Sequence, residues 1–147
     1  SSMNDVKKEI VEVVSSCEVA FLSTINLDNF PETRALINIL NRSIDDKLEI
    51  YFASDSSASK VEQLKKDERA SLYYYNEKIM KNMILFGKAE VVTNKTLKDK
   101  LWHDSFWEYY KDGAEDKSYG ILKFTPIAYK YYIYESAVSQ KKIEGKL

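Results

Sequence analysis

A serine-rich stretch near the middle of the chain has the residue types that could hold an anion. It reads IYFASDSSASKVEQL over residues 50–64, where a strand pattern runs into a loop that opens a helix. A helix N-terminus presents unpaired N–H groups and the positive end of the helix dipole, which favour an anion such as a phosphate. Ser54, Ser57 and Ser59 would add hydroxyl donors, and Lys60 a positive charge. The plainer interpretation, a serine cap beside a solvated lysine, is the one that composition alone favours, because serine is a common cap.

A second candidate is Arg34, which stands among apolar residues in PETRALINIL, residues 31–40. A guanidinium in an apolar strand must find a carboxylate, a carbonyl or a ligand phosphate, because an unpaired buried charge is very costly. A structural ion pair and a ligand contact are equally compatible with this pattern.

Other reactive residue types are scarce. His103 is the only histidine and no G-x-S-x-G motif accompanies it, so we expect a surface residue, with haem ligation as the lesser alternative. Cys17 ends an apolar helical stripe and is expected to be a buried small hydrophobe. Aromatic residues crowd 102–110, which indicates core packing or a second contact such as a subunit interface. No catalytic residue and no metal site is predicted.

Composition excludes several classes of protein. The chain has four glycines, too widely spaced for G-x-G-x-x-G or a P-loop. Its net charge of −1 and scattered lysines argue against a nucleic-acid partner. One cysteine excludes an intrachain disulfide and suits a reducing cytoplasm. No long apolar run is present, so no membrane association is expected.

The elements that must position these residues follow from periodicity and turn residues. Helices are predicted at 4–17, with Asn4 or Asp5 as N-cap, at 58–66 and at 94–112, followed by Gly113 as a C-terminal cap. Strands are predicted at 19–27, 32–40, 47–54, 69–76, 82–93, 119–125 and 128–135. Residues 136–147 are expected to form a charged, solvated tail, and Ser1 and Ser2 to be remnants of cloning. The pattern predicts one mainly β domain over 1–147, an antiparallel barrel with peripheral helices.

Several of these segments, in this order, resemble the pyridoxamine 5′-phosphate oxidase-like flavoproteins. The resemblance is carried by PETRAL (31–36), YFASDSSASK (51–60), ASLYYY (70–75) and FGKAEVV (86–92). The stretch TLKDKLWHDSFWEYYKDG (96–113) followed by YGILKFTP (119–126) is similar to the small general-stress-protein branch. The resemblance implies a six-stranded split β-barrel of Greek-key type, a homodimer, and FMN in the cleft between the subunits.

The resemblance also assigns expected roles to single residues. Arg34 and Lys60 would pair with the FMN phosphate, with Ser54 as a hydroxyl donor to it. Leu36 and the backbone of 34–36, which includes Ala35, would line the isoalloxazine ring. Many relatives have Arg-Lys where this chain has Ser59-Lys60, so Ser57 and Ser59 would compensate for the missing cation.

The expected function is that of an FMN-dependent oxidoreductase acting with small-molecule electron donors and acceptors. Pyridoxamine 5′-phosphate oxidase activity itself is not expected, because the chain has no arginine after Arg69 and no histidine after His103 to hold that substrate. Two alternatives stay open. One is a flavin-binding stress or sensor protein without turnover, and the other is the same fold with deazaflavin F420 or haem.

Overall fold

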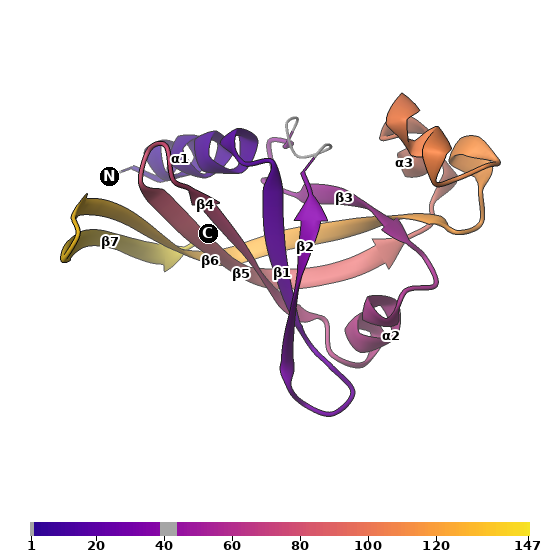
Figure 1. Cartoon of the computed structure of the whole chain (residues 1–147), viewed down its shortest axis with the longest axis horizontal. Coiled ribbons are helices and arrows are strands. Elements are labelled where there is room, and N and C mark those ends of the chain that lie inside the picture. The colour runs from indigo at the N-terminus through magenta and orange to yellow at the C-terminus, as the bar shows by residue number, and fades with distance from the viewer. Residues whose placement is uncertain (1, 39–43) are drawn as a thin grey trace.

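Long antiparallel strands and three α-helices make up the part of the chain that the computed structural model describes, residues 2–38 and 44–147 (Figure 1). The strands are β1 (Val19–Ile25), β2 (Pro31–Ile37), β3 (Ile50–Asp55), β4 (Arg69–Asn76), β5 (Lys81–Val92), β6 (Tyr119–Ser136) and β7 (Ser139–Lys146). The α-helices are α1 (Met3–Ser16), α2 (Ser59–Lys66) and α3 (Lys95–Lys100), and short 3-10 helices span Asp104–Glu108 and Gly113–Glu115. None of the helices in these ranges has the length and apolar composition that crossing a membrane requires.

All seven strands belong to one antiparallel sheet. Its order is β2-β1-β4-β5-β6-β3, and β7 pairs with β6 outside this path. The 18-residue β6 pairs with β5 along one edge, and along its other edge residues 119–124 pair with β3 and residues 128–136 pair with β7. The strands β2 and β3 are therefore the two ends of the path. The predicted mainly β, antiparallel architecture is confirmed.

The core lies between α1 and the inner face of the sheet. Helix α1 has an apolar stripe at helical spacing that is buried there: Val6, Ile10, Val13 and Val14. Cys17 is buried in the same cluster, as predicted. A second, smaller cluster forms around Phe106, Tyr110, Tyr119 and Ile121.

The register between β1 and β2 decides which residues of β2 face inward. Leu22 pairs with Arg34 and Ala20 pairs with Leu36. Directly opposed residues of an antiparallel pair share a face, and Leu22 and Ala20 are fully buried. Arg34 and Leu36 therefore lie on the inner face of β2, and Ala35 lies on the outer face.

A hydrogen bond between two buried polar side chains connects helix α2 to the barrel. The Thr24 hydroxyl on β1 donates a hydrogen bond of 2.6 Å to Oε1 of Gln63 on α2. Thr24 is 1% exposed and Gln63 is 5% exposed. This contact holds the helix that carries Lys60 against the inner side of β1.

The C-terminal part of the chain differs from the prediction in two ways. Residues 119–136 form the single strand β6 instead of two strands flanking Pro126, because a register shift at Phe86/Gly87 accommodates the proline, which has no N–H to give to the ladder. The expected solvated tail at 136–147 is wrong, since β7 pairs with β6 along its length. Its charged side chains stay exposed while Ile143 packs against the core.

The predicted helix at 94–112 is also wrong. Asn94 caps α3 as expected, but the helix ends at Lys100. His103 then adopts an extended backbone and its side chain caps the 3-10 helix Asp104–Glu108. The aromatic side chains of this segment pack against one another, with Trp102 in edge contact with Phe106, Trp107 and Tyr119. Their mutual packing overrides the helical periodicity of the sequence.

Smaller differences concern the ends of elements. Ser2 caps α1, in place of Asn4 or Asp5, by accepting a hydrogen bond from the N–H of Asp5. Strand β3 begins at Ile50 rather than residue 47, because Leu48 has a φ of 63°. Strand β1 ends at Ile25, and the predicted strand at 32–40 extends beyond the described residues at its last two positions.

Gly87 is required by the close approach of β5 and β6. A Cβ at this position would overlap the backbone carbonyl oxygen of Thr125. We expect Gly87→Ala to lower the free energy of unfolding by about 3 kcal/mol or more, because backbone cannot move aside as a side chain can. Urea denaturation measures the change. Gly120→Ala is the control, since its Cβ would first meet the Val91 side chain at 3.0 Å, and equal losses for the two variants would contradict the interpretation.

The Thr24–Gln63 hydrogen bond gives a second test of the fold. Thr24→Val keeps the shape of the side chain and removes two hydrogen bonds of the cluster, the one donated to Gln63 and the one accepted from Arg34, so we expect a loss of about 1–3 kcal/mol in unfolding free energy. Thr33→Val is the matched control, because Thr33 is exposed and its hydroxyl bonds, within the described ranges, only to Ser23 at 2.7 Å. We expect a change within about 0.5 kcal/mol there. Identical thermal midpoints for the two variants would refute the role of Thr24.

Candidate functional site

The loop before α2 is organised by Asp55. Its carboxylate accepts hydrogen bonds from the backbone N–H of Ser57 at 2.9 Å and from the Ser57 hydroxyl at 2.8 Å, which hold the pKa of Asp55 below its usual value. The N-cap residue of α2 is Ala58, which has no side-chain hydrogen bond to offer. The plainer sequence interpretation, that a serine caps this helix, is therefore wrong. The first N–H groups of α2 are left without a side-chain acceptor.

Lys60 stands in the first turn of α2 as a half-buried cation. Burial lowers the pKa of its ammonium group, the positive charge of Arg34 lowers it further, and Asp55 opposes both. Across residues 2–38 and 44–147, no hydrogen bond or ion pair is made by this ammonium. Its neighbour Ser59 is exposed at the first position of the helix. A desolvated cation without a counter-ion is stabilised by an anionic ligand.

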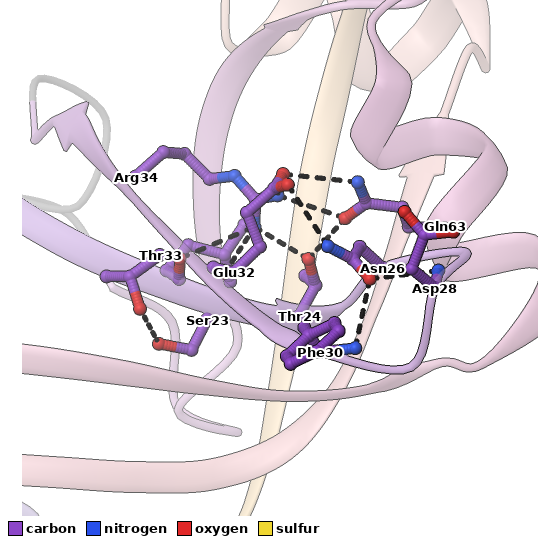
Figure 2. Close-up of polar contacts among 10 residues, drawn as sticks. Ser23, Thr24, Asn26, Asp28, Phe30, Glu32, Thr33, Arg34 and Gln63 are labelled. Carbon is purple, nitrogen blue, oxygen red and sulfur yellow. Dashed lines mark hydrogen bonds and ion pairs between the residues drawn. The ribbon is translucent and has the colours of Figure 1, made fainter.

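Arg34 is held in a polar cluster that Figure 2 shows. Its terminal nitrogens donate to Glu32 at 2.7 Å, to the Thr24 hydroxyl at 2.7 Å and to Oε1 of Gln63 at 3.0 Å. Gln63 in turn donates to Glu32 at 3.2 Å. Hydrogen bonds from Gln63 and Asn26, together with the ion pair to Arg34, lower the pKa of Glu32. The structural ion pair considered for Arg34 is thus present, with Glu32. The positive charge of Arg34 nevertheless lowers the pKa of Lys60.

A cavity of about 350 Å³ lies between the two end strands of the sheet. We call it the β2–β3 pocket. One side is formed by Ala35, Leu36 and Ile37 of β2 and by Ala53 of β3. The other side is the wall formed by the segment 105–110, which contributes Ser105, Phe106, Glu108, Tyr109 and Tyr110. The lining is largely apolar and aromatic, which suits a flat ring.

Asp55 connects the start of α2 with the β2–β3 pocket. Its charge acts on Lys60 on one side and on Tyr110 on the other. Burial is the larger cause that raises the pKa of the Tyr110 hydroxyl, and the negative charges of Asp55 and Asp116 raise it further. The cationic end and the ring-sized cavity are therefore neighbours, as a ligand with a phosphate and a flat ring requires.

The structure brings most of the sequence-predicted site residues to these two places. Ser59 and Lys60 lie at the start of α2, Arg34 on β2 acts on Lys60 by its charge, and Ala35 and Leu36 line the pocket.

Two predicted residues lie differently. Ser54 is 4% exposed on β3, in the same alternating set as the buried Ile50 and Phe52, and its hydroxyl donates to the carbonyl oxygen of Asp55 at 3.4 Å. The Ser57 hydroxyl is engaged by Asp55. Neither contact brings a free hydroxyl to Lys60.

Other site residues were not assigned from the sequence. Gln63 lies three positions after Lys60 on α2, which is the spacing of neighbours on a helix and a signal that could have found it. Glu108, Tyr109 and Tyr110 belong to the aromatic stretch that the sequence singled out, but the wrong helix hid which of them shared a face. His103 is exposed, as predicted, and its Nδ1 lies 2.7 Å from the Ser105 hydroxyl. In the described ranges, no three His, Cys, Asp or Glu residues are grouped to hold a metal ion.

Several solved structures share this architecture. A general stress protein 26-related protein from Clostridium acetobutylicum, of the pyridoxinephosphate oxidase family, is 24% identical with a TM-score of 0.75, covering 97% of this chain and 93% of its own. General stress protein 26 from Bacillus anthracis is 19% identical with a TM-score of 0.71, covering 94% and 98%. An FMN-binding, pyridoxamine 5′-phosphate oxidase-related protein from Nostoc punctiforme is 10% identical with a TM-score of 0.70, covering 100% and 97%.

These likenesses confirm the predicted split-barrel fold class. No curated protein sequence gives a significant match. The family model described as "Pyridoxamine 5′-phosphate oxidase like" matches residues 5–144. Because this match spans nearly the whole chain, the protein belongs to the pyridoxamine 5′-phosphate oxidase-like family.

Proposed function

We propose that the chain binds FMN across the start of α2 and the β2–β3 pocket, and that it works as an FMN-dependent oxidoreductase. The observation that carries the proposal is Lys60, a half-buried cation without a counter-ion in the described chain, at a helix start without a side-chain cap. A phosphate would neutralise it and accept the free N–H groups. The adjoining cavity of about 350 Å³ has the apolar lining that a flavin ring needs.

The residues present fit FMN, with one group placed to bind the phosphate and another to contact the ring. Lys60, the Ser59 hydroxyl and the first N–H groups of α2 would hold the phosphate, and Arg34 would add its charge from within its own ion pair. Leu36 and Ala53 would contact the ring. When bound, FMN supplies hydride and electron transfer, and the protein supplies anchoring, orientation and exclusion of water.

FMN is favoured over haem by the position of the only histidine. His103 is exposed, its Nδ1 is bonded to Ser105, and it is not part of the pocket lining. Pyridoxamine 5′-phosphate oxidase activity is not proposed, since the chain has no arginine beyond Arg69 to hold a second phosphate. The lone buried thiol of Cys17 suits a reducing cytoplasm, where we place the protein.

The proposal predicts which flavins depend on Lys60. Lys60→Ala should weaken FMN binding at least tenfold and leave riboflavin, which has no phosphate, within about twofold, because only the phosphate needs the cation. Flavin fluorescence quenching measures both affinities. Lys65→Ala on the exposed side of the same helix is the control and should change neither affinity. Equal losses for FMN and riboflavin, or unchanged FMN binding, would show that the phosphate is held elsewhere.

The same residue gives the site a pH dependence with a definite sign. Because the pKa of Lys60 is lowered, its charge is lost at a lower pH than that of an exposed lysine. FMN affinity should therefore fall as the pH rises from 7.5 toward 10. Lys60→Arg should flatten this fall, since a guanidinium stays charged over the whole range. A profile that is the same in both proteins would contradict the role of the ammonium.

We also propose that the protein is a homodimer. The outer face of the sheet exposes large side chains on four strands: Phe21, Ile37, Tyr73, Tyr75 and Tyr134. The rings of Phe21 and Tyr73 contact each other at 6.4 Å, and Tyr75 and Tyr134 act electrostatically on Tyr73. We propose a second copy as the occupant, because Ile37 belongs both to this face and to the β2–β3 pocket. A partner there would border the flavin site.

Sedimentation velocity tests the dimer. The wild-type chain should sediment at twice its mass of 17.1 kDa, and Tyr73→Glu should sediment as a monomer, because a carboxylate on an apolar interface is left unpaired. Val138→Glu is the control, since Val138 is 97% exposed in the turn between β6 and β7 and lies off this face. A wild-type monomer that binds FMN tightly would overturn the proposal.

A further inference from the structure

We propose that the wall formed by the segment 105–110 selects an uncharged, flat carbonyl compound, a quinone, as the molecule that accepts electrons from the bound flavin. The inference rests on the proposed FMN function and goes beyond it by naming the substrate class. It is carried by three residues of one wall of the β2–β3 pocket: Glu108, Tyr109 and Tyr110.

The charge of the lining excludes anionic substrates. Glu108 is the only ionisable acid or base among the pocket residues apart from the tyrosines. It is exposed, and in the described parts of the chain it forms no ion pair. The negative charge of Asp55 also acts on the same wall through Tyr110. The cations Arg34 and Lys60 are outside the lining and would face the FMN phosphate, so the charge that a carboxylate or sulfonate meets in the lining itself is a like charge.

Tyr109 offers a surface for stacking. It is 73% exposed and makes no ring contact within the described residues. Its neighbours are fixed by contrast, since Tyr110 packs against Phe106 at 6.4 Å and against Tyr119 at 5.1 Å between ring centroids. An exposed ring on a rigid wall is suited to hold a second flat ring at small entropic cost.

Tyr110 supplies a hydrogen-bond donor. Its ring is buried, and its hydroxyl has no hydrogen-bond partner in the part of the chain that the structure describes. Unlike the fully buried, unpaired Asn38 Oδ1 and Tyr74 Oη, this hydroxyl keeps some exposed surface, and Tyr110 lines the pocket. The raised pKa keeps it protonated. A carbonyl oxygen is the acceptor that would satisfy this O–H group.

The electron transfer balances with these components alone. A quinone held at this wall would take one hydride, supplied by bound reduced FMN, at one carbonyl oxygen and one proton from water at the other. It would become a hydroquinone, and the two electrons given up would leave the flavin oxidised. The Tyr110 hydroxyl orients the carbonyl and is unchanged at the end.

Binding to the oxidised FMN-loaded protein is the first test, because no turnover occurs there. We would titrate 1,4-naphthoquinone and 1,4-naphthoquinone-2-sulfonate and follow the fluorescence of Trp102 and Trp107, which lie in or beside the wall. The uncharged quinone should bind at least tenfold more tightly. Glu108→Gln should reduce this preference to about threefold or less, whereas Glu135→Gln, an exposed acid at the far end of β6, should leave it unchanged.

Tyr110→Phe tests the hydrogen bond and keeps the ring that packs in the cluster. It should weaken 1,4-naphthoquinone binding to the FMN-loaded protein about tenfold, and it should leave thermal stability unchanged, because the hydroxyl has no partner in the described part of the chain. In anaerobic stopped flow, naphthoquinone should reoxidise the photoreduced wild-type protein faster than the variant. If FMN binds while the two quinones bind equally or not at all, this inference fails and the proposed function stands. If FMN itself does not bind, the proposed function fails.

Discussion

The guanidinium of Arg34 faces the inside of the barrel, where a charge without partners would be costly. Three elements supply the partners, since Glu32 lies on β2, Thr24 on β1 and Gln63 on α2. Gln63 follows Lys60 by three residues and therefore lies on the same side of the helix. Neutralising Arg34 thus fixes the start of α2 relative to β2, and the position of Lys60 follows from it.

The two cations of the site are not equivalent as a result. Arg34 has its hydrogen bonds satisfied within the protein, so removing it would disturb the packing of α2 before it affected any ligand. Lys60 has the opposite balance, because it is desolvated, lies near a like charge and has only Asp55 opposing that repulsion. Such a group lowers the stability of the ligand-free protein, and a bound anion removes that cost. Binding sites commonly have residues that reduce folding stability and increase affinity for the ligand.

The sequence predicted those parts of the fold that depend on local pattern. Strand β4 matches at both ends, because buried Leu72 and Tyr74 alternate with exposed Tyr73 and Tyr75. The predicted helix at 58–66 differs from α2 by one residue, because its signals are local as well. The prediction of a helix at 94–112 was wrong, because the aromatic residues there pack on Tyr119, which belongs to a distant strand. The prediction of a solvated tail was wrong as well. The charged residues of β7 have no strand pattern, and their pairing with β6 depends on the free edge of that strand.

The residues of the site also divide into those that local sequence pattern predicts and those that it does not. Residue type and order identified Arg34 and Lys60, because unusual charges near apolar strands stand out in a sequence. The opposite wall of the pocket could be recognised only as an aromatic surplus, since Glu108 and Tyr109 meet Leu36 across a sequence separation of more than seventy residues. Which serine hydroxyls remain free also depended on Asp55, whose contacts with Ser57 are set by the turn and not by composition.

The scarcity of glycine explains why the attraction for a phosphate at this site depends on a lysine side chain. A glycine loop binds phosphate with a series of backbone N–H groups. None of the four glycines lies before α2, and the loop is shaped instead by the Asp55 carboxylate, which accepts from the N–H two residues on. That acceptor places a negative charge beside the helix start and occupies one N–H group. Attraction for a phosphate must then come from a side-chain charge, and a titratable one makes the affinity of the site depend on pH in a way that a backbone cradle would not.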